Sequence, residues 1–453
     1  MPPPATTDEL FDVIDHSGLL PADVWRTYQP SPGRMMSKDA VLARMTRDGV
    51  ITPFHAKQLG LGRHRGFFLN VKYKLLAHLG SGGNGQVYLC EHLLLGRLVA
   101  VKILLPSAVE SAGAVQRFFR EAKAVAALDS PNIVRVFDMD QVGESPFMVM
   151  EYVDGTNLHA VVAQGEPLAV ARAANYARQA ALGLAHAHAA GLVHRDVKPG
   201  NLLVDRAGVV KLLDLGLARF FTHPERNKNL TAKFDAKSVV GTADFMAPEQ
   251  ARDSSGVDIR ADIYGLGGTL YYLLAGRSPF EGATLAQKLD WQQTRPPPPI
   301  TEFRRGVPAG LVAVLERMLA KNPTDRYAAP DAVVKALAPW GEQAVPPPSA
   351  AEMPLVPASA YRLGLSPPPP APSRSADSTA ETPTIEPDAN SEGEPTVDLL
   401  DPHTPNADAV LSKAPRSTVV AAPPRLPVRG WWLAAAAVGL VAAGAFLSWL
   451  LRP

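Results

Sequence analysis

The spacing of apolar positions changes along the chain and divides it into regions. Short apolar runs at residues 87–90 and 98–104 predict two β-strands. The stretch 114–128 has few β-branched residues and places apolar side chains at helical intervals, which predicts a helix. Residues 431–451 form one continuous uncharged block. The pattern therefore predicts mixed α and β structure, followed near the end of the sequence by one uncharged, apolar segment at residues 431–451.

Residues 1–72 carry only short helical signals. These lie at residues 7–14, 21–28 and 37–47, and a fourth begins at Thr52, an N-cap residue followed by proline at the first helical position. We expect a small helical N-terminal segment. Because so short a stretch buries little apolar surface, independent folding and packing against the following region both stay open.

Residues 341–430 are rich in proline, alanine, serine and threonine and poor in aromatic residues. Such a stretch cannot bury enough area to offset its ordering entropy, so we predict a disordered linker that proline keeps extended. Thr382, Thr384 and Thr396 lie beside prolines and acidic residues. Phosphothreonine-reading partners would suit these sites, and a plain spacer is the alternative.

The uncharged block at residues 431–451 predicts a transmembrane helix. At about 1.5 Å per residue it spans about 31 Å, the hydrocarbon thickness of a bilayer. Trp431, Trp432 and Trp449 lie near its ends, where interfacial anchors occur. A buried helix of a globular domain is the alternative.

Fewer residues bear on the orientation and self-association of this span. Arg425 and Arg429 favour a cytoplasmic position for the preceding chain, and we expect a single-pass anchor at the C-terminus without a signal peptide at the N-terminus. Ala435, Gly439 and Ala443 recur at four-residue steps and permit close helix contact. A homodimer is one interpretation, and chance in an alanine-rich segment is the other.

Charge and cysteine content exclude several functions. A net charge of +1 with mixed signs leaves no electrostatic footprint for nucleic acid, so we expect no such partner. The single cysteine, Cys90, excludes an internal disulfide and is interpreted as a packed strand residue. His186 and His188 are two residues apart on a predicted helix and face different ways, which argues against a metal site there.

The chemistry-bearing residues gather at residues 194–201, which read HRDVKPGN, and at Asp214. Asp196 can orient a hydroxyl and accept its proton, and the Lys198 ammonium can contact a transferred phosphoryl group. Asn201 and Asp214 supply an amide and a second carboxylate, which can hold magnesium. Their order and spacing predict phosphoryl transfer.

A nucleotide-binding pattern lies upstream. Residues 80–87 fit G-x-G-x-x-G-x-V, a loop whose backbone N–H groups close over phosphates. A dinucleotide-binding domain would continue into a helix, whereas strands follow here. Lys102 ends an apolar strand pattern and needs an anion, for which nucleotide phosphates and Glu121 are the candidates. A solvated surface charge is the alternative for Glu121.

Together, these motifs resemble those of bacterial eukaryotic-type (Hanks-type) serine/threonine protein kinases over residues 73–340. The resemblance implies an α+β, bilobal fold with a β-rich small lobe and an α-helical large lobe, and it implies ATP and Mg²⁺. It assigns catalysis to Asp196, Lys198, Lys102 and Glu121, and metal binding to Asn201 and Asp214. The expected ATP contacts are Leu79, Gly80, Ser81, Gly82, Gly85, Val87, Lys102, Met150, Glu151 and Val153.

The stretch from Asp214 to residues 241–249 resembles the family's activation segment, with Leu215 where phenylalanine is usual. Leucine fills the same apolar slot with less area, so catalysis should survive. Residues 262–267 resemble the start of the central large-lobe helix, and Arg326 resembles the arginine that pairs with Glu249.

The choice of hydroxyl follows from the same resemblance. Lys198, two residues beyond the base, is typical of serine/threonine kinases, as is Thr242. Arg195 suits a phosphate added to the activation segment, and we expect autophosphorylation at Ser238 or Thr231.

We therefore expect a serine/threonine protein kinase that transfers the γ-phosphate of ATP to protein substrates. It would be anchored to the cell membrane with its kinase domain in the cytoplasm. A pseudokinase that only binds nucleotide or acts as a scaffold is the alternative. The set Lys102, Glu121, Asp196, Asn201 and Asp214 favours activity, because pseudokinases usually lack at least one of its members.

Overall fold

A computed structural model describes residues 1–31, 36–82, 85–104, 112–143, 145–215, 243–252, 256–282 and 284–354. The predicted autophosphorylation sites Thr231 and Ser238 lie outside these ranges, as do Thr242, the linker beyond residue 354 and the predicted membrane span at 431–451. In the described ranges, no helix has both the length and the apolar character of a membrane span.

The N-terminal segment contains the helices that the sequence predicts. They are α1 (Thr7–Ser17), α2 (Ala22–Trp25) with the 3-10 turn η1 (Arg26–Tyr28), α3 (Lys38–Arg47) and α4 (Pro53–Gly60). Thr52 caps α4 as expected, because its side chain accepts the His55 N–H. The apolar faces of α1, α3 and α4 meet in a core of their own that includes Ile14, Val41 and Leu59.

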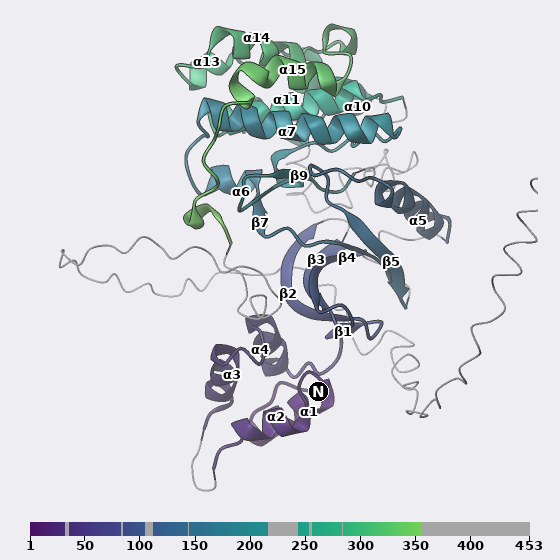
Figure 1. The fold of residues 1–453 in the computed structure, drawn as a ribbon, viewed down its shortest axis with the longest axis vertical. Coiled ribbons are helices and arrows are strands. Elements are labelled where there is room, and N and C mark those ends of the chain that lie inside the picture. Colours follow the sequence, from purple (N-terminus) through teal and green to yellow (C-terminus); the bar gives the residue numbers. More distant parts are fainter. Residues whose placement is uncertain are drawn as a thin grey trace, which may run out of the picture. The chain divides into compact units, whose positions relative to one another are not determined.

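The same segment also packs against the sheet that follows it (Figure 1). His55 Nε2 lies 2.5 Å from the carbonyl oxygen of Leu75 in β2, and the Phe54 ring meets Tyr88 of β3 edge to face. The segment therefore has a core of its own and also packs against the small-lobe sheet, which is the second of the two possibilities.

A six-stranded antiparallel sheet forms most of the small lobe (Figure 1). The strand order is β1-β2-β3-β4-β6-β5. The strands are β1 (Phe68–Leu69), β2 (Tyr73–Gly82), β3 (Gly85–His92), β4 (Arg97–Leu104), β5 (Val136–Val142) and β6 (Ser145–Glu151), and helix α5 (Ala112–Ala126) packs against β5. The two predicted strands and the predicted helix are confirmed. Cys90 is buried in β3, as expected.

The large lobe is built mainly from helices. Its elements are β7 (Gly155–Asn157), α6 (Leu158–Ala163), α7 (Val170–Ala189), η3 (Pro199–Asn201), β8 (Leu202–Asp205), β9 (Val210–Leu212), α10 (Pro248–Arg252), α11 (Arg260–Ala275), α12 (Leu285–Thr294), α13 (Ile300–Phe303), α14 (Ala309–Met318), η5 (Pro323–Asp325) and α15 (Pro330–Gly341). Helix α7 packs against α11 and α15 (Figure 1). Nearly every residue of α11 is buried, which confirms the predicted central helix.

The chain between α5 and β5 ties the two lobes together. Leu212 of β9 donates its N–H to the carbonyl oxygen of Asn132 at 2.9 Å, and its own carbonyl accepts the N–H of Val134 at 3.0 Å. Gly183 of α7 makes room for this contact, since a Cβ there would lie 2.6 Å from the Asn132 carbonyl oxygen. This junction joins the chain that leads into β5 of the small lobe to strand β9 and helix α7 of the large lobe.

The structure differs from the sequence prediction just beyond Gly341, where we predict a disordered linker. Residues 342–354 pack back onto the large lobe and include η6 (Ala350–Glu352). Met353 is buried in the large-lobe core, and Arg172 of α7 pairs with Glu352 at 2.7 Å. We call residues 342–354 the C-terminal strap. A second ion pair joins Arg178 of α7 to Glu342. One apolar anchor and two ion pairs offset the cost of ordering a stretch whose composition alone predicts disorder.

Candidate active site

Three side chains of residues 194–201, which we call the catalytic loop, converge. Lys198 Nζ lies 2.9 Å from Asp196 Oδ2. Asn201 Nδ2 donates both to that oxygen, at 2.9 Å, and to the backbone carbonyl of Asp196, at 2.8 Å. The Asp196 carboxylate is therefore held at Oδ2 by an amide and an ammonium, which fixes its rotamer. Among the residues that the structure describes, its Oδ1 is the atom suited to accept a proton from a hydroxyl.

Lys102 and Asp214 meet from opposite lobes. Lys102 is only 8% exposed, and its Nζ lies 2.6 Å from Asp214 Oδ2. Burial acts to raise the pKa of Asp214, but the Lys102 ammonium, with smaller contributions from His194 and Lys198, lowers it below its usual value. Asp214 is thus held as a carboxylate. The sequence predicts that Lys102 pairs with nucleotide phosphates or with Glu121. Glu121 lies in α5, but its side chain is outside the described residues.

The positions of Asn201 and Asp214 fit a divalent cation. The backbone N–H of Leu213 donates to the carbonyl oxygen of Asn201 at 2.9 Å, so Asp214 follows directly on a residue bonded to Asn201. Because Asn201 Nδ2 is engaged by Asp196, its amide oxygen is the atom suited to a metal. A carboxylate and an amide oxygen are the ligand types that Mg²⁺ prefers.

A buried carboxylate anchors the backbone of the catalytic loop. Asp262 of α11 accepts the backbone N–H groups of His194 at 2.8 Å and Arg195 at 2.7 Å, and His188 Nε2 at 2.7 Å. Arg195 has a φ of 66° and Asp214 a φ of 57°, a strained conformation for these residue types. These bonds help hold Arg195 in its strained conformation.

Sequence reasoning missed this anchoring role. The sequence pattern places Asp262 at the start of a helix and argues against a metal site at His188, and it predicts no contact between the two residues. The sequence context of Asp262 does indicate that it has partners, because a carboxylate buried in an otherwise apolar helix needs hydrogen-bond donors. What the sequence lacks is the identity of those partners, which come from two separate segments, helix α7 and the loop at residues 194–195.

The residues expected to contact the nucleotide line up on neighbouring strands. Gly80, Ser81 and Gly82 of β2 pair with Val87, Gln86 and Gly85 of β3, and Val87 lies opposite Lys102 of β4. Gly85 leaves no room for a side chain, since a Cβ would lie 2.3 Å from the carbonyl oxygen of Ile103. Leu79, an apolar residue of this hairpin, is 46% exposed. The register thus places Lys102 beside the glycine-rich β2–β3 hairpin in the small-lobe sheet.

The remaining expected ATP contacts lie at the junction of the lobes. Met150 and Glu151 end β6, opposite Ala100 and Val99 of β4, and Val153 is buried just beyond them. The Glu151 carboxylate is engaged by Lys211 at 3.0 Å. Its side chain is therefore directed to the large lobe, so a nucleotide contact at this residue would use the main chain.

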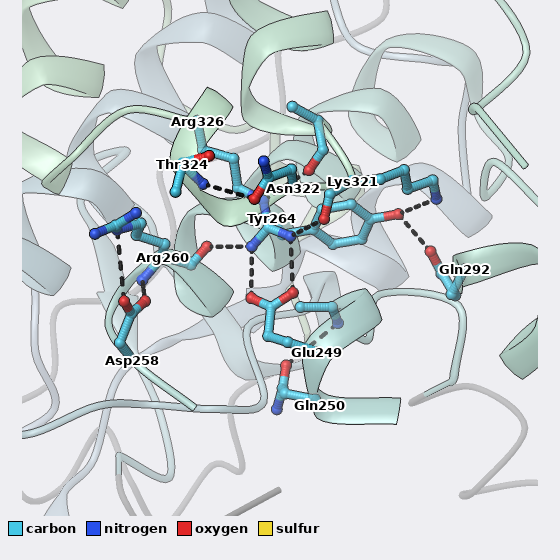
Figure 2. Close-up of polar contacts among 12 residues, drawn as sticks. Glu249, Gln250, Asp258, Arg260, Tyr264, Gln292, Lys321, Asn322, Thr324 and Arg326 are labelled. Atoms are coloured by element: carbon cyan, nitrogen blue, oxygen red, sulfur yellow. Dashed lines mark hydrogen bonds and ion pairs between the residues drawn. The ribbon is translucent and has the colours of Figure 1, made fainter. Parts of the chain in front are cut away.

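The predicted pair of Glu249 and Arg326 is confirmed (Figure 2). Arg326 Nη1 and Nη2 lie 2.6 and 2.8 Å from the two carboxylate oxygens, and the guanidinium also donates to the backbone carbonyl of Arg260. The pair fixes α10, and with it the loop that precedes α10, to the core of the large lobe.

A β-rich small lobe and a helical large lobe meet at this site, which is the architecture of the protein kinases. Residues 73–337 match the sequence model described as "Protein kinase domain", and the chain belongs to the protein kinase family. Family members use ATP and Mg²⁺ as substrate and cofactor.

Several bacterial proteins are similar over this region. Serine/threonine-protein kinase Pkn1 of Myxococcus xanthus is 43% identical over 262 residues, covering 56% of this chain and 36% of Pkn1. Serine/threonine-protein kinase PknB of Mycobacterium tuberculosis is 39% identical over 264 residues, covering 57% of this chain and 41% of PknB. The chain thus spans about two-fifths of the length of these relatives. A crystal structure of the M. tuberculosis PknI kinase domain has a TM-score of 0.49 and 28% identity, covering 61% of this chain and 99% of that domain.

Proposed function

We propose that this chain is a serine/threonine protein kinase that transfers the γ-phosphate of ATP to hydroxyls of protein substrates. The observation that carries the proposal is the convergence of Asp196, Lys198 and Asn201 on one side and of Lys102 with Asp214 on the other. The chain's similarity to Pkn1 and PknB, both named as serine/threonine-protein kinases, supports the choice of acceptor.

Each of these side chains has a distinct task. Lys102 binds the phosphates from the small lobe, and Asp196 orients the acceptor hydroxyl and takes up its proton. Lys198, next to Asp196, places positive charge where the phosphoryl group moves. Asn201 and Asp214 would hold Mg²⁺, which neutralises charge on the phosphates when it is bound. Asp262 keeps the loop in the conformation that presents Asp196.

A phosphotransfer assay with radiolabelled ATP and myelin basic protein tests this function. Wild-type protein should label the acceptor, and Asp196→Asn should lower the rate by about 10²- to 10⁴-fold, the usual loss of a general base. Lys102→Ala should abolish labelling because the phosphates lose their small-lobe cation. Nucleotide binding by the wild type without transfer would establish the pseudokinase alternative instead.

The membrane association that the sequence predicts is also part of the proposal. Residues 431–451 would anchor the chain by a single pass, with the kinase domain on the cytoplasmic side and the linker as a tether. Association of the spans into a homodimer, autophosphorylation at Ser238 or Thr231, and phosphothreonine-reading partners of the linker remain predictions.

Fractionation of cells tests the anchor. The full chain should sediment with membranes and resist carbonate extraction, and a chain ending at residue 430 should be recovered in the supernatant. Recovery of both chains in the supernatant would contradict the anchor.

A further inference from the structure

Helix α12 lies against the loop that borders the proton-accepting carboxylate. We call residues 243–247 the acceptor loop. Its residues Phe245 and Met246 line a pocket together with Asp196 and Gln250. Because the acceptor loop and Asp196 line the same pocket, the position of this loop bears on how a substrate chain can approach the Asp196 carboxylate.

Gln292 of α12 holds the backbone of the acceptor loop. Its Nε2 donates to the carbonyl oxygens of Ala243, at 3.1 Å, and Asp244, at 2.9 Å. Only 1% of Gln292 is exposed, so both amide hydrogens are used in the protein interior. Loss of these donors would leave two buried carbonyl groups short of partners.

Lys288, one turn earlier on the same helix face, holds the side chain of the loop. Its Nζ lies 2.7 and 2.8 Å from the two carboxylate oxygens of Asp244, and Ser278 donates to the same carboxylate at 3.1 Å. Lys288 is buried, with 5% of the residue exposed. A buried ion pair adds little net stability over apolar residues of the same volume, so its clearest effect is to fix the loop's position.

Tyr264 of α11 sets the orientation of the Gln292 amide (Figure 2). Burial raises the pKa of the Tyr264 phenol, so the hydroxyl stays protonated. It donates a hydrogen bond to Gln292 Oε1 at 2.5 Å. Lys321 Nζ donates to the Tyr264 oxygen at 2.8 Å. Because Oε1 faces Tyr264, Nε2 must face the acceptor loop. A continuous chain of bonds thus runs from Lys321 to the loop carbonyls.

We propose that Gln292 and Lys288 are positioning residues for the phosphoryl acceptor. They fix the acceptor loop beside Asp196 and thereby set the affinity for the protein substrate, whereas Lys102 and Asp214, which serve the nucleotide, lie outside these contacts. This inference rests on the proposed kinase function.

Steady-state kinetics of the full chain with myelin basic protein and ATP test the inference. Gln292→Met and Lys288→Met should raise the KM for the acceptor about tenfold, while the KM for ATP and the affinity for MgATP alone change less than about twofold. Lys288→Arg keeps the cation opposite Asp244 and should restore the acceptor KM. Gln293→Met removes a neighbouring amide of the same helix that does not contact the loop, and it should behave as wild type.

The outcomes separate this inference from the proposed function. An equal rise in both KM values, or a fall in kcat alone, would show that α12 acts only through general stability and would overturn the inference. Unchanged kinetics in both methionine variants would overturn it too. If Gln292→Met does not fold, Lys288→Met and its arginine rescue decide the question. Failure of the wild type to label any acceptor, with MgATP still bound, would remove the kinase function itself and this inference with it.

Discussion

At the residue scale, the site depends on charged groups whose partners come from distant parts of the sequence. Lys102 lies on a small-lobe strand, Asp214 follows a large-lobe strand, and 2.6 Å separates their charged atoms. The sequence identified both residues, because each stands at a position that phosphoryl transfer requires. Their contact depends on the packing of the two lobes, which spacing along the chain does not encode.

His55 provides a test of electrostatics at the same scale. The residue is 1% exposed, and burial lowers the pKa of its imidazole to about 4 from an ordinary value of 6.5. Between pH 4 and pH 6.5, His55 is therefore protonated in the unfolded chain and neutral in the folded chain. Stability contributed by neutral His55 is present above pH 6.5 and is lost as the pH falls toward 4.

Hydrogen exchange of the α4 amides should report this loss. We expect their free energy of opening to fall by about 3 kcal/mol between pH 7 and pH 4 in the wild type. The fall should be much smaller in His55→Gln, which cannot take up the proton. Equal pH dependence in the two proteins would contradict the assignment.

At the element scale, local patterns predicted most helices and strands, and long-range contacts account for what they missed. The cap at Thr52 and the apolar spacing of 114–128 are local signals, and both elements form as expected. The C-terminal strap has no such signal, because its proline-rich composition predicts disorder. It is ordered by contacts with α7, far away in the sequence.

Two substitutions in the C-terminal strap distinguish the contribution of apolar packing from that of a surface ion pair. Met353→Asp places a charge in the large-lobe core and should weaken strap docking by about 2–4 kcal/mol, seen as faster hydrogen exchange of the Glu352 and Met353 amides. Glu342→Gln breaks an ion pair with Arg178 in which Glu342 is largely exposed, so it should change exchange very little. Similar effects of the two substitutions would contradict the packing described for Met353.

At the scale of the whole molecule, the chain joins a helical N-terminal segment, a two-lobed kinase domain and the strap. The sequence predicted the two lobes because the family's motifs are ordered along the chain and each belongs to one lobe. It did not predict how the lobes and the flanking segments are joined. Lys211 with Glu151, and His55 with Leu75, are contacts that only the fold brings together.

The most direct test of the central claim is the initial rate at which the full chain transfers γ-phosphate to serine and threonine of myelin basic protein, compared between wild type and Asp214→Asn. We expect Mg²⁺-dependent labelling by the wild type. We also expect a rate at least about 100-fold lower for the variant, or roughly 2.7 kcal/mol of lost transition-state stabilisation, measured on variant protein shown to be folded by circular dichroism. A variant as fast as the wild type, or a folded wild type that labels no acceptor, would contradict it.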